Sequence, residues 1–484
     1  MGHLTPGARS PTPSHSALGG TRALRFPLQI AEHMPDPATS GSNVFYRKLT
    51  RQYPRIVRGE GCYLFDDTGR RYLDACGGAF VVNVGHGVAE IASAIGHQAG
   101  RLGYVSGMSF THDPVEELAA EIARLSAGDL ELVYPLGSGS EAVEAALKLA
   151  RQYWIESGRG AKRKVLTLTP SYHGNTLLAL SASARPHYSA FFKDWMVDVL
   201  RVPAPYSYRC ECRGKPPYCT ACSGVAIEAA ILEAGPDSVA ALIAEPIGGS
   251  STGAAVPPAG YWERVREACH RHQVLLIADE VLTGAGRTGT WSALEPYGVA
   301  PDIMTLGKGI AGGYAPLSAV VTTRAIAGAL ARGTGSLAHA QTFSHHPVLC
   351  AAGVATLRYL RQNRLIERGA EMGRVLHRRL AELRDLPLVG DVRGRGLLAG
   401  IEFVADRETR EPMPRSAGFA EAFTQAALDA GLVVWPNVGH ADGRNGDLVM
   451  LAPPFIVTED QIEEIAALFT RALRDAAERV GVAR

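Results

Sequence analysis

The sequence predicts an α/β protein, with a mostly parallel sheet covered by helices in a large domain and a smaller α+β domain beside it. From about residue 85, short runs of consecutive apolar residues alternate with helical stretches. Strands that are apolar on both faces and separated by helices indicate a parallel sheet that is covered on both sides. Long amphipathic helices over 346–386, followed by three strand-like runs, indicate the smaller domain.

Each element has its own signal along the chain. Residues 53–75 are typical of short strands and turns, with a tight turn over Asp66–Gly69. Helices are predicted over 114–126 and 141–157. The apolar runs of the large sheet are 132–134, 165–168, 240–244, 274–278 and 317–321. The smaller domain adds strand-like runs over 397–404, 432–435 and 448–451, and then a helix whose start is marked by the capping-box pair Thr458 and Gln461.

Length and composition bound the class of protein. The 484 residues suffice for two domains, and 46% hydrophobic with 20% charged residues is ordinary for a soluble globular chain. A net charge of +1 favours neither nucleic acid nor an anionic membrane, and no apolar run is long enough to span a bilayer. We expect a cytoplasmic protein. The expected organisation is a disordered tail over 1–40, the N-terminal part of the small domain over 41–84, the large domain over 85–344 and the C-terminal part of the small domain over 345–484.

Four of the eight cysteines form a cluster: Cys210, Cys212, Cys219 and Cys222. The spacing is C-x-C, six residues, then C-x-x-C, which is not a standard zinc-ribbon pattern. Four thiolates in a short loop could close a tetrahedral zinc site, and free thiols or disulfides are the alternatives. In each case we expect a structural staple that lies away from the chemistry.

Four loops that follow predicted strands carry candidate functional residues, because ligands bind outside the strand ends in such sheets. In the first, Gly137 to Glu141, a helix begins behind a Ser138–Glu141 capping pattern, and the N–H groups of Gly139 and Ser140 could bind a phosphate. It is not a nucleotide P-loop, since no Lys-Ser/Thr pair follows. A plain capped helix is the alternative.

The other three loops supply a ring, an acid and an amine. Tyr172 could stack on a planar ligand, or be a half-buried core aromatic. Asp279 ends a strongly apolar strand, so it could hold a protonated ring nitrogen or form a structural salt bridge. Lys308 lies between glycines, where burial would make its amine nucleophilic, although a solvated lysine is the alternative. An anion cradle, a stacking ring, a buried acid and an amine are the groups that pyridoxal phosphate needs.

These segments, in this order and at these spacings, resemble the class III (omega-type) aminotransferases of fold type I over roughly residues 42–475. Further matching pieces are Asp74 to His86, Glu245-Pro246, Gly286 to Gly289, Thr342-Phe343-Ser344 and Gly390 to Gly394. The resemblance implies a seven-stranded sheet and a small domain built from both termini. It also implies a homodimer with shared active sites, or a tetramer.

The resemblance implies roles for the matching residues. Lys308 would form the Schiff base with pyridoxal phosphate and shuttle the proton, and Asp279 would contact the pyridine nitrogen. Tyr172 and Val281 would pack on opposite faces of the cofactor, and Glu245 would orient polar groups near its hydroxyl. The remaining expected cofactor ligands are Ser138, Gly139, Ser140, His173 and Thr342, the last donated by the other subunit.

Departures from the family pattern concern the substrate. Ser250 stands where several members place an acid that masks an arginine at the position of Arg393, so Arg393 is expected to be free for a carboxylate, with a structural arginine as the alternative. Trp435 stands where many amine-specific members carry an arginine. The predicted activity is transfer of an amino group from an amine or omega-amino acid to pyruvate or 2-oxoglutarate. An aminomutase, a decarboxylating transaminase and a non-catalytic binding protein of this fold are the alternatives.

Overall fold

The structure is a computed structural model that describes residues 42–49 and 51–481. The predicted disordered tail over 1–40 lies outside the described residues. Contacts divide the chain into Met1–Pro54 and Arg55–Arg484, and every element below belongs to the second unit. None of the described helices is long and apolar enough to cross a membrane.

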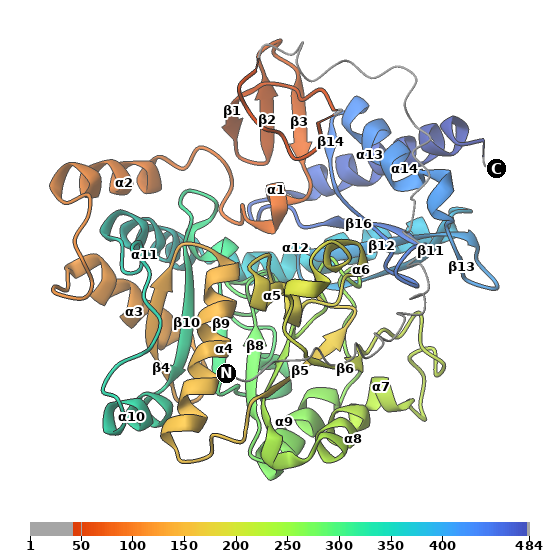
Figure 1. Ribbon diagram of the computed structural model, residues 1–484. Helices are drawn as coiled ribbons and strands as arrows, with labels where there is room; N and C mark the ends of the chain where they lie inside the picture. The colour runs from red at the N-terminus through yellow and green to blue at the C-terminus, as the bar shows by residue number, and fades with distance from the viewer. Residues whose placement is uncertain (1–41, 50, 482–484) are drawn as a thin grey trace, which may run out of the picture. The chain divides into compact units, whose positions relative to one another are not determined.

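A seven-stranded sheet forms the centre of the molecule, in the order β4-β10-β9-β8-β7-β5-β6 (Figure 1). β10 runs antiparallel to both of its neighbours, and the other pairings are parallel. The prediction of a mostly parallel seven-stranded sheet is therefore confirmed. The strands are β4 (Leu130–Leu136), β5 (Lys164–Thr169), β6 (Leu200–Pro203), β7 (Val239–Ala244), β8 (Leu275–Asp279), β9 (Ile303–Leu306) and β10 (Ser318–Thr323).

Helices cover both faces of this sheet. Ile243 and Ile277 pack with α4 (Gly139–Glu156) in one core cluster. Their neighbours Leu242 and Leu276 belong to a different cluster, with α8 (Val225–Ala234) and α9 (Tyr261–Arg271). Successive side chains of a strand point to opposite faces, so β7 and β8 are apolar throughout because each face meets its own helices.

Two smaller sheets carry the ends of the chain. One has the order β1-β2-β3-β14, in which β3 (Arg71–Asp74) pairs parallel with β14 (Leu432–Val433), so it joins N- and C-terminal segments as predicted. The other has the order β11-β12-β16-β15. The strand expected over 432–435 is therefore two strands in different sheets. The remaining strands are β1 (Ile56–Glu60), β2 (Tyr63–Asp66), β11 (Val389–Arg395), β12 (Leu398–Asp406), β13 (Glu411–Pro412), β15 (Trp435–Val438) and β16 (Asp447–Leu451).

Of the remaining helices, α3 lies at the predicted 114–126, α11 and α12 lie within the predicted 346–386, and α14 begins with the predicted capping box of Thr458 and Gln461. They are α1 (Gly77–Phe80), α2 (Ala89–Arg101), α3 (Asp113–Leu125), α5 (Leu177–Ala182), α6 (Pro186–Ser189), α7 (Thr220–Ser223), α10 (Arg324–Arg332), α11 (Pro347–Gln362), α12 (Leu365–Ala381), α13 (Phe419–Asp429) and α14 (Glu459–Arg479).

Candidate active site

The predicted functional residues follow the carboxyl ends of neighbouring strands. Ser138 follows β4, Tyr172 follows β5, Glu245 follows β7, Asp279 ends β8 and Lys308 follows β9. These strands all run in one direction, since β10 is antiparallel to both β4 and β9 and the rest pair in parallel. The five loops therefore open at one edge of the sheet, where ligands bind in this class of fold.

Asp279 and His173 form a buried pair at this edge. Asp279 Oδ2 lies 2.6 Å from His173 Nδ1, and Asp279 Oδ1 accepts from the Thr305 hydroxyl at 3.1 Å and the Val281 N–H at 3.2 Å. Burial alone would lower the pKa of His173, but the hydrogen bond and charge of Asp279 outweigh it and raise that pKa. Asp279 is thus a buried carboxylate whose oxygens are held by His173, Thr305 and the Val281 N–H.

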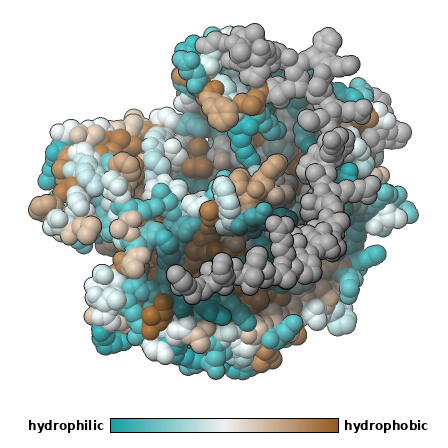
Figure 2. Space-filling view, in the orientation of Figure 1, coloured by the Kyte–Doolittle hydropathy of each residue, from teal (hydrophilic) through white to brown (hydrophobic). Residues whose placement is uncertain are grey.

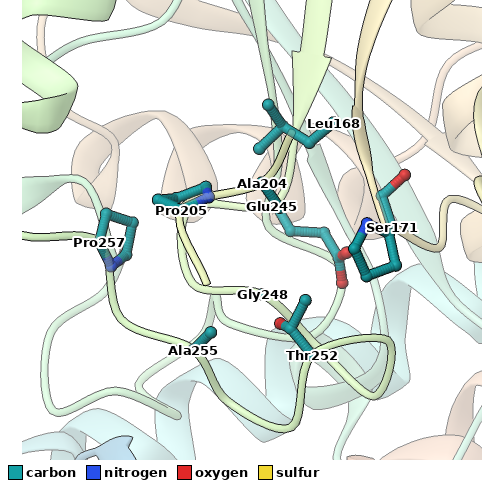
Figure 3. Close-up of a pocket in the computed structure, with 10 residues that line it drawn as sticks. Leu168, Ser171, Ala204, Pro205, Glu245, Gly248, Thr252, Ala255 and Pro257 are labelled. Atoms are coloured by element: carbon teal, nitrogen blue, oxygen red, sulfur yellow. The ribbon is translucent and has the colours of Figure 1, made fainter. Parts of the chain in front are cut away.

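Glu245 ties two loops of the site together. Its carboxylate accepts from the Tyr172 N–H at 3.2 Å and from the Gly249 N–H at 2.9 Å. Burial raises the pKa of Glu245, with the charge of His173 opposing and that of Asp279 adding to the rise. Figure 3 shows this carboxylate in a small pocket that Ser171 and Thr252 also line.

Lys308 begins a short 3-10 helix, Lys308–Ala311, in a left-handed conformation with φ of 44°. Burial lowers the pKa of its amine, against the opposing charges of Asp279 and Glu245. Lys162 is also buried, and burial lowers its pKa to about 8, but its Nζ donates to the carbonyls of Pro236, Val239 and His272. Lys162 is therefore structural, whereas Lys308 interacts electrostatically with Asp279 and Glu245, the two acids of the site.

The start of α4, where an anion cradle is predicted, is capped by Ser138. The Ser138 hydroxyl accepts from the Glu141 N–H at 3.3 Å, while the Glu141 carboxylate accepts from Gly137 N–H at 2.9 Å instead of closing a capping box on Ser138. A Cβ at Gly139 would lie 2.8 Å from Val281 Cγ1. Glycine is therefore needed at 139, because the helix start and Val281 are in close contact.

Ser140 connects this cradle to the loop after β5. Its hydroxyl accepts from the Asn175 N–H at 3.0 Å, and a Cβ at Gly174 would lie 2.6 Å from the same oxygen. The loops that carry Ser140 and Tyr172 are thus in direct contact, as a shared site requires.

Arg185 and Tyr188 lie near Tyr172, and neither was identified from the sequence. The buried guanidinium of Arg185 lies 5.5 Å from the ring centroids of both Tyr172 and Tyr188 and donates to the Ser250 carbonyl at 3.3 Å. It also contacts Asn437. The hydrogen-bond partners of Arg185, Ser250 and Asn437, come from segments far away in the sequence, so no local signal could have identified its role.

The expectation that Arg393 is free to bind a carboxylate is wrong. Its guanidinium is 2.8 Å from Glu402 and 2.9 Å from Asp391, and it donates to Tyr206 at 2.7 Å. The acid that pairs with it is Glu402, on the neighbouring strand β12, and not a residue at position 250. Its part in substrate binding stays a prediction, and it would require Glu402 to release it.

The last two predicted residues lie on other elements. Trp435, at the start of β15, is partly buried and its ring centroid lies 5.3 Å from that of Phe80. Thr342 is exposed, and its carbonyl accepts a hydrogen bond from Tyr104 at 2.9 Å. Their roles in binding substrate and the partner's cofactor stay predictions.

The four clustered cysteines meet in space. Their sulfur atoms all lie within 4.8 Å of one another, and all eight cysteines of the chain are free thiols. The cluster sits between β6 and α8, outside the site just described.

Comparison with known proteins agrees with this geometry. The family model of class-III aminotransferases matches residues 46–473. The chain is 37% identical to the uncharacterized aminotransferase YodT of Bacillus subtilis over 87% of this chain and 95% of that one. It is 35% identical to the putrescine–pyruvate aminotransferase of Pseudomonas aeruginosa over 90% and 94% of the two chains. Among solved structures, the omega transaminase from Pseudomonas jessenii in complex with PMP has a TM-score of 0.82 and 32% identity, over 89% of this chain and 94% of that one.

Proposed function

The chain belongs to the class-III aminotransferases, and from this membership and the site geometry we propose that it moves an amino group from an amine or omega-amino acid to a keto acid such as pyruvate or 2-oxoglutarate. The membership makes it an enzyme that uses pyridoxal phosphate. The observation that carries the proposal is the placement of Glu245, Asp279 and Lys308 at or just after the carboxyl ends of the neighbouring parallel strands β7, β8 and β9.

The residues present fit the cofactor. The N–H groups of Gly139 and Ser140 at the start of an 18-residue helix suit its phosphate. Asp279, oriented by His173 and Thr305, suits a protonated ring nitrogen. Val281 packs against Gly139 at the helix start, which supports its proposed contact with one face of a flat ring, with Tyr172 proposed for the other face. When bound, pyridoxal phosphate supplies an electron-withdrawing ring and an aldehyde that reacts with amines.

The chain's own residues then have separable tasks. Asp279 holds a proton at the ring nitrogen, and His173 and Thr305 hold Asp279. Lys308, with a pKa lowered by burial, can remove a proton from the substrate carbon and return one as a general base and acid. The Glu245 carboxylate positions Tyr172 by accepting from the Tyr172 backbone N–H. It positions the next loop by accepting from the Gly249 N–H.

The substrate class rests on relatives and on Arg393. The putrescine–pyruvate aminotransferase, which is similar over 90% of this chain, is named for an amine donor and a keto acid acceptor. With Arg393 paired to Glu402 and Asp391, no carboxylate is required of the donor. Trp435, beside Phe80, would line the substrate side of the site.

We also infer a homodimer in which Thr342 reaches the cofactor of the partner. Support comes from large exposed apolar residues around the α2–α3 connection and next to Thr342. They are Leu102, Tyr104, Met108, Phe110 and Phe343. Figure 2 shows hydrophobic side chains on the side of the molecule where Figure 1 places α2 and α3. An apolar surface of this kind is typical of a subunit interface. Sedimentation of the purified chain tests this, and a monomer at micromolar concentration would contradict it.

A half-reaction assay tests the proposed activity. Putrescine or β-alanine, added to the holoenzyme without a keto acid, should abolish the visible absorbance of the bound cofactor, and pyruvate should restore it. Turnover of an amino acid without any acceptor would instead indicate an aminomutase, and release of carbon dioxide a decarboxylating enzyme.

A lysine variant tests the assignment of the site. Borohydride should fix the cofactor to the peptide that contains Lys308, as read by mass spectrometry, and Lys308→Ala should prevent this. Lys164→Ala is the matched control, because Lys164 donates to the Ala234 carbonyl on another part of the sheet. Labelling that persists in Lys308→Ala would refute the assignment.

A further inference from the structure

The loop between β6 and α8 brings together four thiols that the proposed chemistry does not use. Cys210 Sγ lies 3.3 Å from Cys212 Sγ and 3.2 Å from Cys222 Sγ, and all four sulfur atoms, including that of Cys219, lie within 4.8 Å of one another. In a tetrahedral zinc site, a Zn–S distance of about 2.3 Å places the sulfur atoms about 3.8 Å apart. The observed sulfur–sulfur distances, from 3.2 Å to at most 4.8 Å, are compatible with this value.

The backbone of the loop is folded so that the two cysteine pairs face each other. After Cys210 the chain reverses through Arg213 and Gly214, with φ of 52° and 67°. The Arg213 N–H donates to the Cys210 carbonyl at 3.2 Å, and the Lys215 N–H to the Cys212 carbonyl at 2.9 Å. These hydrogen bonds of the turn hold Cys210 and Cys212, the first cysteine pair, close together.

Charge in the loop also suits a metal–thiolate centre. One zinc ion with four thiolates carries a net charge of −2. The loop itself contributes Arg213 and Lys215 against a single acid, Glu211, while the charge of Arg209 is paired with Glu402. This cationic excess would stabilise the centre on a surface loop, whereas four neutral thiols need no such balance.

The loop makes specific contacts with the C-terminal part of the chain. Tyr206 bonds to Glu402, Arg209 Nε donates to Glu402 Oε1 at 2.7 Å, and Tyr206 accepts from Arg393 at 2.7 Å. Arg410 bonds to the Tyr208 carbonyl. The residues just before the cysteine cluster therefore contact Glu402, the acid that holds Arg393.

We propose that Cys210, Cys212, Cys219 and Cys222 bind one structural zinc ion, and that this ion fixes the loop that positions Glu402 and Arg393. The ion has four protein ligands and no open position, so it takes no part in amino-group transfer. Zinc removal should loosen the loop first and the β11–β12 hairpin through it.

Metal analysis of the full chain, purified under reducing conditions without chelator, tests the site. We expect about one zinc per chain, and X-ray absorption at the zinc edge should give four sulfur neighbours at about 2.3 Å. Cys212→Ser and Cys219→Ser should lose most of this zinc, while Cys350→Ala, which changes a buried thiol in the α11 core, should retain it. Absence of zinc, iron in its place, disulfides within the cluster, or nitrogen and oxygen neighbours would each overturn the proposal.

Hydrogen exchange of the wild-type chain tests the positioning role of the zinc ion, so the test does not depend on the folding of a variant. When a chelator removes the zinc from the wild-type chain, amides over 206–222 and those of β12 near Glu402 should exchange faster, and α4 should serve as the unchanged internal reference. Unchanged exchange over 206–222 after complete zinc removal would refute the anchoring role.

Discussion

The contact between Gly139 and Val281 gives a quantitative test of the site. In Gly139→Ala the new carbon would lie 2.8 Å from Val281 Cγ1, which is about 0.7 Å or more inside an ordinary carbon–carbon contact of about 3.5–4.0 Å. Either the start of α4 or Val281 must move. Both are proposed cofactor contacts, so the displacement should weaken cofactor binding. Overpacking of this kind costs roughly 1–3 kcal/mol; when the free protein relieves the clash by moving and cofactor binding must reverse that movement, the cost falls on binding and corresponds to about a 5- to 150-fold rise in Kd.

The assay is a titration of the apoenzyme with pyridoxal phosphate in a double-mutant cycle with Val281→Ala, which removes the atoms that clash. The two changes should be coupled, with the double variant binding at least about 0.5 kcal/mol more tightly than the sum of the single effects. Gly100→Ala in α2 is the control, because an added carbon there meets no atom within 4 Å. Additive effects of Gly139→Ala and Val281→Ala would show that the contact is not what limits binding, and the reasoning would fail.

Three further predictions concern the acids and the ring. Asp279→Asn keeps the shape but removes the charge, so kcat/KM should fall roughly 100- to 1000-fold while the cofactor remains bound; a near-normal rate would exclude its role at the ring nitrogen. Glu402→Gln removes the buried charge that Arg393 and Arg209 share, although Asp391 still pairs with Arg393, and should destabilise the chain by up to about 3–5 kcal/mol at pH 7, measured by urea unfolding. Burial alone would raise the pKa of Glu402, but the charges of Arg393 and its other cationic neighbours hold it well below its usual range. The stability that ionised Glu402 contributes is therefore fully present above its usual pKa of 4.5 and is lost as the pH falls through the lowered value, so the difference between wild type and variant should shrink on acidification and would contradict the pairing if it grew. Tyr172→Ala should weaken cofactor binding by about 0.5–1.5 kcal/mol, whereas Tyr172→Phe should bind nearly as the wild type does, and equal losses would argue against stacking.

Much of the large sheet was predictable because its strands are apolar on both faces. β7 and β8 are buried throughout, and their continuous apolar runs identify them without ambiguity. β9, which has only four residues before the Gly307–Lys308 loop, is not among the predicted apolar runs. β11 was not identified because its sequence, VGDVRGR, has no apolar run and is mostly half-buried.

The site was predictable where it depends on strand ends and unpredictable where it depends on register. Asp279 follows an apolar run and Lys308 lies between glycines in a segment with little other charge, so both could be identified from the chain alone. The partner of Arg393 could not, because Glu402 approaches it only through the pairing of β11 with β12, in which Arg393 lies opposite Gly400 and Asp391 lies opposite Glu402. Arg185 and Tyr188 likewise reach Tyr172 through tertiary packing.

The backbone at position 308 has a consequence for evolution under selection for stability alone. A lysine with φ of 44° occupies a region that side chains with a Cβ disfavour and glycine adopts freely. Replacing Lys308 with Gly would thus relax the peptide while removing the amine, so the inactive chain could be the more robust one. A lysine in that conformation therefore puts local backbone strain at the position where the proposed chemistry requires an amine.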